Sequence, residues 1–445
     1  MRSDRAGWTA AAVLAGAYLA VGWLRFHHLW AGALDLGVFD QGAWLLSQGR
    51  APELTVLHEN LFGDHLSLVM LLFAPLYRLV ATPLWLLAAQ AAALGLAVLP
   101  LRAIARHVGT DPRLATAAAA LSGPFLAAAV FDFHPAVLAT PAVAWAVLGA
   151  IRDDVRMCTL AGLAVALMRA DLAIVLLGVA VVAAPACRRR LILLVPVPVV
   201  ASVVVGALLH TEQTWARYYG HIGAGPLDAA LHPWRLLEAL ATQTALQTLF
   251  LWLLPVGFLA LARPRWALAL VIGGLPLILS GAFATSAPWF HHGAAMAPLA
   301  IAGALVVLGR DRPWWVRPQM LVGGAIASLL VASPLAPFAP GRVHLATMVV
   351  ARSDPGYRAA LTHVRPDDRV AADSVALAQL SQRTEAYVAP CPFAPWPTGE
   401  QCELEGGAAA VDVVITKAKW SDVLEAEGFT VQTMPGGTVI VGRRD

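Results

Sequence analysis

The feature that most constrains this chain is a series of long apolar segments separated by short clusters of Arg, Asp, His and Pro. Segments such as LWLLAAQAAALGLAVLPL approach the roughly 20 apolar residues that a helix needs to cross a bilayer core of about 30 Å. A transmembrane β-barrel would instead need strands of about 10 residues with alternating polarity, and these segments do not alternate. The sequence therefore predicts a polytopic α-helical membrane protein.

Composition supports this class and argues against a nucleic-acid partner. Hydrophobic residues make up 59% of the chain and charged residues 13%, whereas roughly a quarter of a soluble domain is charged. The 31 basic and 28 acidic residues nearly balance, with a net charge of +3, and nucleic-acid binding normally needs a strong basic excess. The expected surroundings are membrane lipids.

The positive charges predict the topology of about eleven spans, because cytoplasmic loops of membrane proteins are enriched in Arg and Lys. With the N-terminus in the cytoplasm, every dense Arg cluster falls on the cytoplasmic side. The spans are expected near residues 8–24, 82–101, 114–131, 136–151, 157–168, 172–186, 191–209, 243–262, 266–284, 293–309 and 319–335.

Two segments can be read in more than one way. The choice rests on whether the number of membrane crossings before each Arg cluster is even, which keeps the cluster in the cytoplasm, or odd, which exposes it. Counting residues 66–80 as a span would expose Arg102 and Arg106 to the outside, so this segment is interpreted as an interfacial or re-entrant helix. Merging residues 157–186 into one helix would expose the Arg triplet at residues 188–190. We therefore expect two short helices there, broken where protein or a water-filled cavity covers the turn.

The chain is expected to have two domains, at residues 1–339 and 340–445. The first holds the spans and a first outer loop, residues 25–81, with interfacial helices. The second has the composition of a soluble chain, with short strand-like and helical segments that indicate a small extracytoplasmic α/β domain. Pro435-Gly436-Gly437 lies between two strand-like segments and predicts a hairpin turn.

The four cysteines fall into two kinds. Cys391 and Cys402 lie in a Pro-rich loop of the outer domain, where an oxidising compartment would permit a disulfide, so they are either paired or free. Cys158 and Cys187 lie in apolar sequence and are expected to be inert core thiols.

The first outer loop contains Asp35 and Asp40 among aromatic residues, and acids in such a setting at a membrane face indicate a site. The two are five residues apart, so on one continuous helix they would point about 140° apart. Gly37 could break that helix and leave either acid facing a cavity. Alternatively, Asp35 caps an interfacial helix that starts at Leu36.

Asp64 and His65 lie in the same loop, and a carboxylate beside an imidazole suits helix capping, proton transfer or a divalent metal. If a metal such as Mg or Mn binds, its candidate ligands are Asp40, Asp64 and His65. Nothing in their spacing requires a metal.

Further candidates lie at turns between predicted spans. In Phe131-Asp132-Phe133-His134-Pro135, the proline can start a helix and Asp132 can cap it. Capping does not explain His134, so Asp132 and His134 either belong to the turn alone or also form part of a site. His291 and His292 follow Trp289 at the outer rim, where they form part of an interface belt or line a phosphate pocket.

Arg169 and Asp171 are embedded in apolar sequence, where each ionisable group costs about 2.5 to 3.5 kcal/mol at mid-bilayer on insertion scales. They form either a mutual salt bridge or a site in which the guanidinium fork of Arg169 holds a lipid phosphate. Walker, dinucleotide Gly, HExxH and CxxC motifs do not occur, which argues against nucleotide-driven transport, dehydrogenases, zinc proteases and thiol redox chemistry.

Five segments carry a family resemblance: DLGVFDQGAW, DHLSLVMLLFAPLY, FDFHPAVLATP, RADLAIVLLG and SQRTEAYVAP. Through them the chain resembles the domain-of-unknown-function 2079 family of predicted bacterial membrane proteins over nearly its whole length. That family is similar to the GT-C superfamily of polytopic glycosyltransferases, which use polyprenyl-phosphate sugars and carry an essential Asp in the first outer loop. The resemblance implies a GT-C-like fold in the bacterial plasma membrane, with the essential carboxylate at Asp35 or Asp40.

The first functional hypothesis is a glycosyltransferase that moves a sugar from a polyprenyl-phosphate donor to a glycan, lipid or protein acceptor on the outer face. Asp35 or Asp40 would be the general base, and Arg169 with His134 or His291 would neutralise the phosphate leaving group. The expected substrate-binding residues are His65, Asp132, His134, Arg169, Asp171, His291 and His292.

The alternative is a transporter or lipid flippase, a class that often has inverted repeats and polar residues near the midplane. Here the polar residues gather at one face, and no repeat is apparent. A third hypothesis makes the spans an anchor for the C-terminal domain, although an anchor needs far fewer of them.

Overall fold

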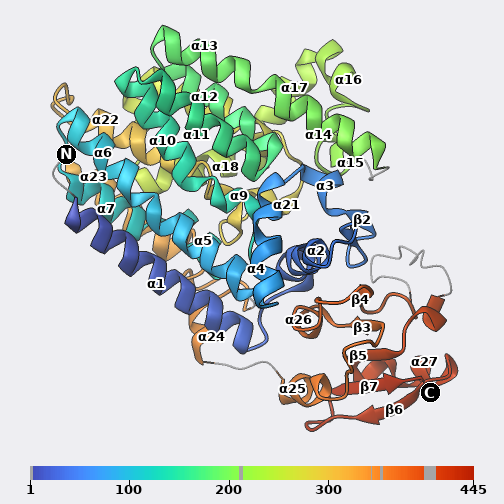
Figure 1. Cartoon of the computed structure of the whole chain (residues 1–445). Coiled ribbons are helices and arrows are strands. Elements are labelled where there is room, and N and C mark those ends of the chain that lie inside the picture. The colour runs from blue at the N-terminus through green and yellow to red at the C-terminus, as the bar shows by residue number, and fades with distance from the viewer. Residues whose placement is uncertain (1–3, 210–213, 342, 351–353, 395–406, 445) are drawn as a thin grey trace. The chain divides into compact units, whose positions relative to one another are not determined.

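The computed structural model describes residues 4–209, 214–341, 343–350, 354–394 and 407–444 (Figure 1). The chain forms two compact units, each built from segments far apart in the sequence. We call residues 1–22, 62–69 and 87–345 the helical unit, and residues 23–61, 70–86 and 346–445 the sheet unit. Because the sheet unit combines the first outer loop with the C-terminal segment, these units differ from the expected domains, and the boundary at residues 339 and 340 stays a prediction.

The helical unit consists of apolar helices joined by short turns, as its sequence predicts. Helix α1 (Arg5–His27) begins in it, and the short 3-10 helices are labelled η. The others are α3 (Leu61–His65), α5 (Leu84–Leu96), α6 (Val98–Val108), α7 (Pro112–Ala120), α8 (Gly123–Val130), α9 (Pro135–Leu138), α10 (Thr140–Arg152), α11 (Val155–Met168), η3 (Ala170–Ile174), α12 (Val175–Val182), α13 (Pro185–Leu194), α14 (Pro196–Leu208), α15 (Thr214–Tyr219), α16 (Pro226–Leu231), α17 (Pro233–Leu240), α18 (Gln243–Leu253), η4 (Leu254–Val256), η5 (Leu259–Ala262), α19 (Pro264–Gly273), α20 (Leu275–Ile278), α21 (Phe283–Ser286), η6 (His291–Gly293), α22 (Ala297–Val307) and α23 (Pro318–Val331).

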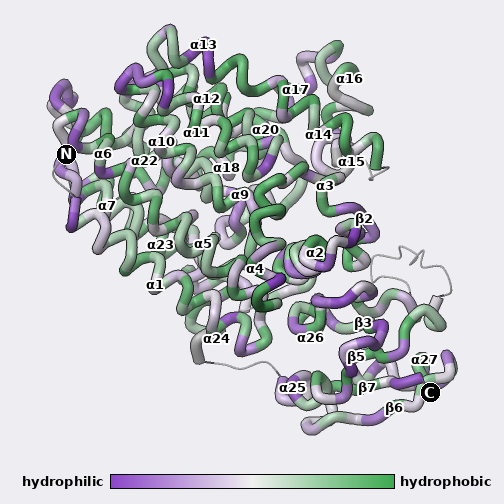
Figure 2. Tube along the Cα trace, in the orientation of Figure 1, coloured by the Kyte–Doolittle hydropathy of each residue, from purple (hydrophilic) through white to green (hydrophobic). Residues whose placement is uncertain are grey.

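Among the described residues, four helices are long and apolar enough to cross a membrane, or six if each of two bent helix pairs counts as one span. The four are Arg5–His27, Leu84–Val108, Pro135–Arg152 and Pro185–Leu208. Figure 2 shows that hydrophobic residues predominate along the helices of this unit. The remaining predicted spans coincide with apolar helices of 10–17 residues, so the count of eleven stays a prediction.

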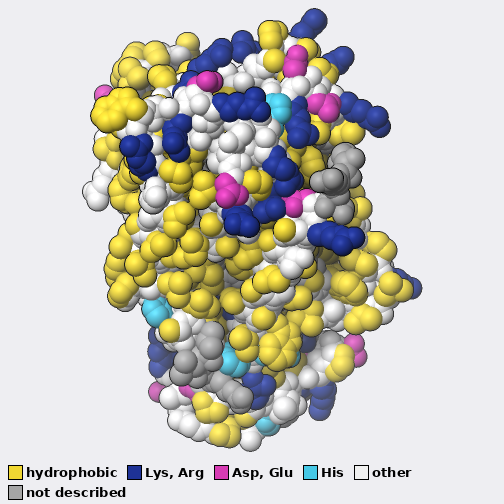
Figure 3. All heavy atoms as spheres, turned by 90° about the vertical axis from the view of Figure 1, so that its left-hand side faces the viewer, with side chains coloured by type: hydrophobic (Ala, Val, Ile, Leu, Met, Phe, Trp, Pro, Cys, Tyr) yellow, Lys and Arg dark blue, Asp and Glu magenta, His cyan; other side chains and the backbone are white. Residues whose placement is uncertain are grey.

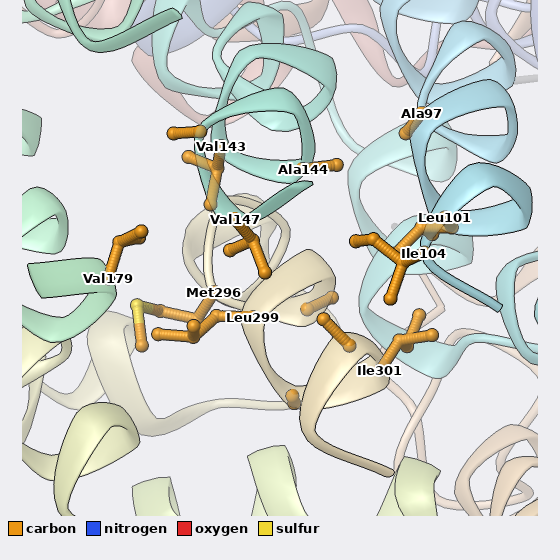
Figure 4. Packing of buried hydrophobic residues seen from close by; sticks show 14 of the residues in the cluster. Ala97, Leu101, Ile104, Val143, Ala144, Val147, Val179, Met296, Leu299 and Ile301 are labelled. Atoms are coloured by element: carbon orange, nitrogen blue, oxygen red, sulfur yellow. The ribbon is translucent and has the colours of Figure 1, made fainter. Parts of the chain in front are cut away.

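Small residues bring the helices of this unit close together. Figure 4 shows Leu101 of α6, Val147 of α10 and Leu299 of α22 within one continuous core. Helices α12 and α19 meet at two glycines: a Cβ on Gly178 would lie 2.7 Å from the Cα of Gly273. Close backbone approach through small residues is the usual way in which membrane helices pack.

Charged contacts hold one end of the helical unit together. Asp4 accepts hydrogen bonds from Arg102 at 2.9 Å and from Arg106 at 2.8 Å. The hydrogen bonds from Arg102 and Arg106 hold the pKa of Asp4 well below its ordinary value, although burial opposes them. In the view of Figure 3, Arg side chains gather in the upper part of the face, and a broad band of hydrophobic side chains lies below them.

Both ambiguous segments are helical but short. Helix α11 ends where Arg169 is extended, with φ −164° and ψ 120°, and η3 and α12 follow. The expectation of two short helices instead of one is thereby confirmed. Residues 68–79 form an apolar helix of η2 and α4, and at about 1.5–2 Å per residue it is too short for a bilayer core of about 30 Å. Its interfacial or re-entrant position stays a prediction.

The sheet unit holds a five-stranded mixed sheet in the order β4-β3-β5-β7-β6 and a two-stranded ribbon, β1-β2. In this unit η1 is a π-helix and the other η elements are 3-10 helices. Its elements are η1 (Ala33–Gly37), α2 (Val38–Ser47), β1 (Glu53–Leu54), β2 (Glu59–Asn60), η2 (Leu68–Leu72), α4 (Phe73–Leu79), α24 (Leu345–Val350), α25 (Pro355–Leu361), β3 (Val370–Ala372), α26 (Ser374–Leu377), β4 (Ala386–Val388), η7 (Gly407–Ala410), β5 (Val413–Lys417), η8 (Ala418–Trp420), α27 (Ser421–Ala426), β6 (Thr430–Thr433) and β7 (Val439–Arg443).

The predicted hairpin is confirmed. Strands β6 and β7 pair antiparallel, with Thr433 opposite Ile440. Gly436 and Gly437 in the turn have φ values of 95° and 74°, a left-handed conformation that glycine adopts without steric cost. Strands β3, β4 and β5 pair in parallel, and Val414 and Ile440 are in the core of the sheet.

The cysteines agree with expectation as far as they are described. Cys158 and Cys187 are free and buried. Cys391 is disulfide-bonded and 1% exposed. Cys402 lies outside the described residues, so the pairing of these two cysteines stays a prediction.

Candidate functional site

The helical unit brings together four histidines that are far apart in the sequence. The rings of His134 and His291 stack with centroids 4.0 Å apart, and those of His291 and His292 are 4.2 Å apart. His65 lies edge-on to His134 at 6.3 Å. We call these four residues the histidine cluster. They come from helix α3, the turn before α9, and the short helix η6, so the fold brings three distant segments of the chain together at one point.

His134 is held in place by the turn that contains it. Its Nδ1 accepts a hydrogen bond from the backbone N–H of Ala136 at 3.2 Å and so caps α9, in which Pro135 is the first residue. The expectation that Asp132 supplies this cap is wrong, because the ring reaches the free N–H two residues ahead. Gln90 accepts from the His134 N–H at 2.9 Å. Since Nδ1 accepts, Nε2 carries the proton of the neutral ring.

His291 is the member of the cluster that most clearly indicates a ligand. The residue is 4% exposed, and neither ring nitrogen has a hydrogen-bond partner in the described part of the chain. A buried polar group without a partner costs about 1–3 kcal/mol. A ligand that accepts a hydrogen bond from this ring would remove that cost.

Burial lowers the pKa of His134, His291 and His292, which lie between the apolar helices, and for His292 the value falls to about 3. The positive charge of Arg169 lowers all three further. The rings are therefore neutral at physiological pH, and each can donate one hydrogen bond.

Arg169 adds a positive charge close to the histidine cluster. Its Nε and Nη2 donate to the two carboxylate oxygens of Asp171 at 2.7 and 2.6 Å, in the bidentate geometry that guanidinium favours. The mutual salt bridge expected from the sequence is therefore present. The side chain of Arg169 is 14% exposed and that of Asp171 is 38% exposed. The carboxylate is therefore the more exposed partner of this ion pair.

The sheet unit contains a second constellation, around Asp40. This residue is 1% exposed and accepts three hydrogen bonds: from Tyr77 at 2.7 Å, Ser381 at 2.6 Å and Gln382 at 3.0 Å. Burial raises the pKa of Asp40 to about 6, although the three donors oppose the shift. A carboxylate engaged in this way fixes the first outer loop to the C-terminal segment.

Gln41 strengthens the same connection. Its amide donates to Thr55 at 2.7 Å and to the Arg383 carbonyl at 3.2 Å. A Cβ on Gly37 would lie 3.8 Å from the Cβ of Ser381, so the backbones approach closely here. Sequence reasoning missed these contacts, although both partners lie in segments that carry the family resemblance, FDQ at residues 39–41 and SQRT at residues 381–384.

Asp35 has a different environment from Asp40. It lies inside the π-helical turn η1 and is only half-buried. The helix cap is Gly32, not Asp35, and Gly37 is helical with φ −63° and ψ −40°. The capping role proposed for Asp35 is therefore wrong, Gly37 does not break the helix, and one helical segment carries the two acids.

The described residues contain no group of three or more His, Cys, Asp or Glu side chains that could hold a metal ion. Of the candidate ligands, Asp40 is occupied by its three donors, and the side chain of Asp64 lies outside the description. A Mg or Mn site involving Asp40, Asp64 and His65 stays a prediction.

The fold is similar to that of a known membrane protein. A crystal structure of ArnT from Cupriavidus metallidurans bound to undecaprenyl phosphate aligns with a TM-score of 0.55 and 14% identity, over 99% of this chain and 98% of that one. The apo structure of the same protein aligns with a TM-score of 0.53 and 16% identity, over the same shares of both chains. Comparison with curated protein sequences gave no match.

ArnT is a glycosyltransferase with the GT-C fold, so the class defined here is that of helical membrane proteins with a GT-C-like fold. The chain belongs to the family described as predicted membrane protein, DUF2079, whose model matches residues 25–428. The resemblance to this family is thereby confirmed, and the similarity to ArnT concerns the fold.

Proposed function

We propose that this protein is a membrane glycosyltransferase that transfers a sugar from a polyprenyl-phosphate donor to an acceptor on the extracytoplasmic face. The observation that carries the proposal is the buried histidine cluster, in which the ring nitrogens of His291 have no hydrogen-bond partner among the described residues and Arg169 is nearby. The fold is similar to that of a protein solved with undecaprenyl phosphate. This combination suits a phosphate group attached to a lipid.

The cluster would act on the leaving group. During transfer, the bond between the sugar C1 and the phosphate oxygen breaks, the acceptor hydroxyl oxygen bonds to C1, and the phosphate gains negative charge. Arg169 and the N–H groups of His134 and His291 would stabilise that charge, which preorganised donors do effectively in a site that excludes water. Asp171 would hold the Arg169 guanidinium in its orientation.

The acceptor hydroxyl must lose a proton, and we assign that role to Asp35. A general base typically contributes 10²- to 10⁴-fold in rate. Asp35 is half-buried and is the more accessible of the two acids, since Asp40 is 1% exposed and accepts hydrogen bonds from Tyr77, Ser381 and Gln382. Asp40 therefore suits a positioning role, in which it fixes the helical segment that carries Asp35.

We also propose eleven spans, a cytoplasmic N-terminus and an extracytoplasmic C-terminal segment. Asp4 contacts Arg102, and residues in contact lie on the same side of a membrane, so an even number of crossings separates them. Helix α1 and the pair α5 and α6 supply two, which favours a non-crossing helix at residues 68–79. The backbone N–H of Arg310 also bonds to Val108, which supports one shared face for these Arg clusters.

The test is transfer or hydrolysis of labelled sugar from a panel of polyprenyl-phosphate sugars by the purified protein in lipid nanodiscs. Asp35→Asn is expected to abolish turnover while donor binding and thermal stability remain. Asp40→Asn is expected to retain measurable turnover. Absence of both binding and turnover across the panel, with folded protein, would reject the proposal and favour the transporter or flippase alternative.

A further inference from the structure

The sheet unit contains an open pocket with a volume of about 620 Å³. Its polar lining includes Arg50, Glu53, Thr55, Arg369, Thr384, Glu385 and Tyr387. The volume lies in the range of about 300–1,000 Å³ that is typical of small-molecule sites. Arg50 and Glu53 are exposed, so a ligand can enter directly from solvent.

The pocket is held in shape by contacts between its two walls. The Thr55 hydroxyl accepts from the backbone N–H of Ala386 and donates to the carbonyl of the same residue, both at 2.9 Å. Arg50 donates to the hydroxyl of Thr384 at 2.6 Å. These bonds join the first outer loop to the edge strand β4, so little ordering is needed when a ligand binds.

The charges of the pocket argue against an ionic ligand. The lining itself carries two guanidinium groups, of Arg50 and Arg369, and two carboxylates, of Glu53 and Glu385. Asp412, which is not part of the lining, pairs with the guanidinium of Arg369 at 2.8 Å. An anion would meet two carboxylates without a surplus of positive charge, and a cation would meet two guanidinium groups. A neutral ligand encounters no net repulsion.

The same groups match a ligand rich in hydroxyls. A carboxylate only accepts hydrogen bonds, through its two oxygens, and a guanidinium group only donates them, from a planar fork of N–H groups. A sugar hydroxyl both donates and accepts, so neighbouring hydroxyls can bridge a Glu and an Arg of the lining. The hydroxyls of Thr384 and Tyr387 add groups that can act in either sense.

We propose that this pocket binds a neutral carbohydrate, the glycan part of the acceptor molecule. The assignment of the glycan to the acceptor rests on the proposed transferase function, whereas glycan binding itself does not. The ligand class thereby narrows from a glycan, lipid or protein acceptor to one that presents neutral sugar residues.

The experiment is binding of the full-length, detergent-purified protein to an array of neutral and acidic glycans, followed by measurement of Kd for the glycans that bind. The pocket variants are Arg50→Ala and Glu385→Gln. The matched controls are Arg365→Ala and Glu425→Gln, which change exposed residues outside the pocket in the same unit. Thermal unfolding checks that every variant is folded.

Neutral glycans are expected to bind, with Kd at least tenfold higher in both pocket variants and within twofold of wild type in both controls. Preference for acidic glycans, unchanged binding by the pocket variants, or no glycan binding by folded wild-type protein would overturn the inference. Binding of polyprenyl phosphate, measured in parallel, separates the two proposals. If the pocket variants lose glycan binding but the wild-type protein does not bind polyprenyl phosphate, the glycan site is supported and the proposed transferase function is rejected.

Discussion

The carboxylate of Asp40 accepts a hydrogen bond of 2.6 Å from the hydroxyl of Ser381, although 341 residues separate the two in the sequence. Tyr77 and Gln382 donate to the other oxygen of the same carboxylate. The carboxylate of Asp40 is thus surrounded by one donor from the same outer loop, Tyr77, and two from the C-terminal segment, Ser381 and Gln382.

Replacing Asp40 by Ala is expected to lower the free energy of unfolding by about 3 kcal/mol at pH 5, because buried donors that lose their acceptor cost about 1–3 kcal/mol each. Asp40→Asn keeps the size and one acceptor oxygen, so its loss should be below about 1 kcal/mol. Thermal unfolding in detergent measures both, with Asp422→Ala as an exposed control. Equal losses in Asp40→Ala and the control would show that the contact is not stabilising.

Asp40 should also make stability depend on pH. Burial raises its pKa from 3.8 to about 6 in the folded protein, so the folded state holds this proton more tightly than the unfolded chain does. The stabilisation is complete below pH 3.8 and is lost as pH rises through about 6, by roughly 3 kcal/mol for a shift of about two pKa units.

The measurement is the difference in thermal stability between wild type and Asp40→Asn from pH 4 to pH 7. Other carboxyl groups titrate in both proteins and cancel in the difference. As pH rises, wild type should lose stability relative to Asp40→Asn. A difference that stays constant from pH 4 to pH 7 would contradict the raised pKa of Asp40.

His291→Phe is expected to weaken polyprenyl-phosphate binding at least tenfold, which corresponds to about 1.4 kcal/mol, because it removes a buried donor and preserves ring packing. The matched control is His107→Phe, at an exposed position of α6 in the same unit. Binding can be measured with a fluorescent polyprenyl phosphate in nanodiscs. Equal affinity in both variants would exclude His291 from the phosphate site.

Gly178→Val should disturb the packing of α12 on α19. A Cβ at Gly178 would lie 2.4 Å from the Ala269 carbonyl oxygen, and overpacking of this kind costs about 1–3 kcal/mol or more. Gly323→Val on α23 is the control, because a Cβ there meets nothing within 4 Å. A clearly lower melting temperature is expected for Gly178→Val alone, and similar values for both variants would argue against close packing of these helices.

Sequence reasoning predicted the features that depend on local pattern. The apolar segments identified the helices, the Arg169-Ala170-Asp171 segment marked a real break between α11 and η3, and Pro435-Gly436-Gly437 marked the β6-β7 turn. Hydropathy and turn chemistry act over a few residues, so one sequence contains enough information to recognise them.

The features that it missed depend on contacts between distant segments. The sequence does not distinguish Asp40 from Asp35 as a candidate base, because nothing within the first outer loop indicates that Ser381 and Gln382 bind the Asp40 carboxylate. Asp132 looked like the cap of α9, but the His134 ring reaches the N–H of Ala136 instead. His65, His134, His291 and His292 were each identified as candidates, yet only the fold reveals that their rings are neighbours.

The distance along the chain between Asp40 and Ser381 has a consequence for biosynthesis. A ribosome that adds roughly 5–20 residues per second makes the partner of the first outer loop about 20–70 seconds after the loop itself. During that interval Asp40 lacks two of its three donors, Ser381 and Gln382. The loop therefore stays incompletely folded until the end of the chain has been made, and a polypeptide truncated before residue 381 would leave this surface uncovered and open to proteolysis.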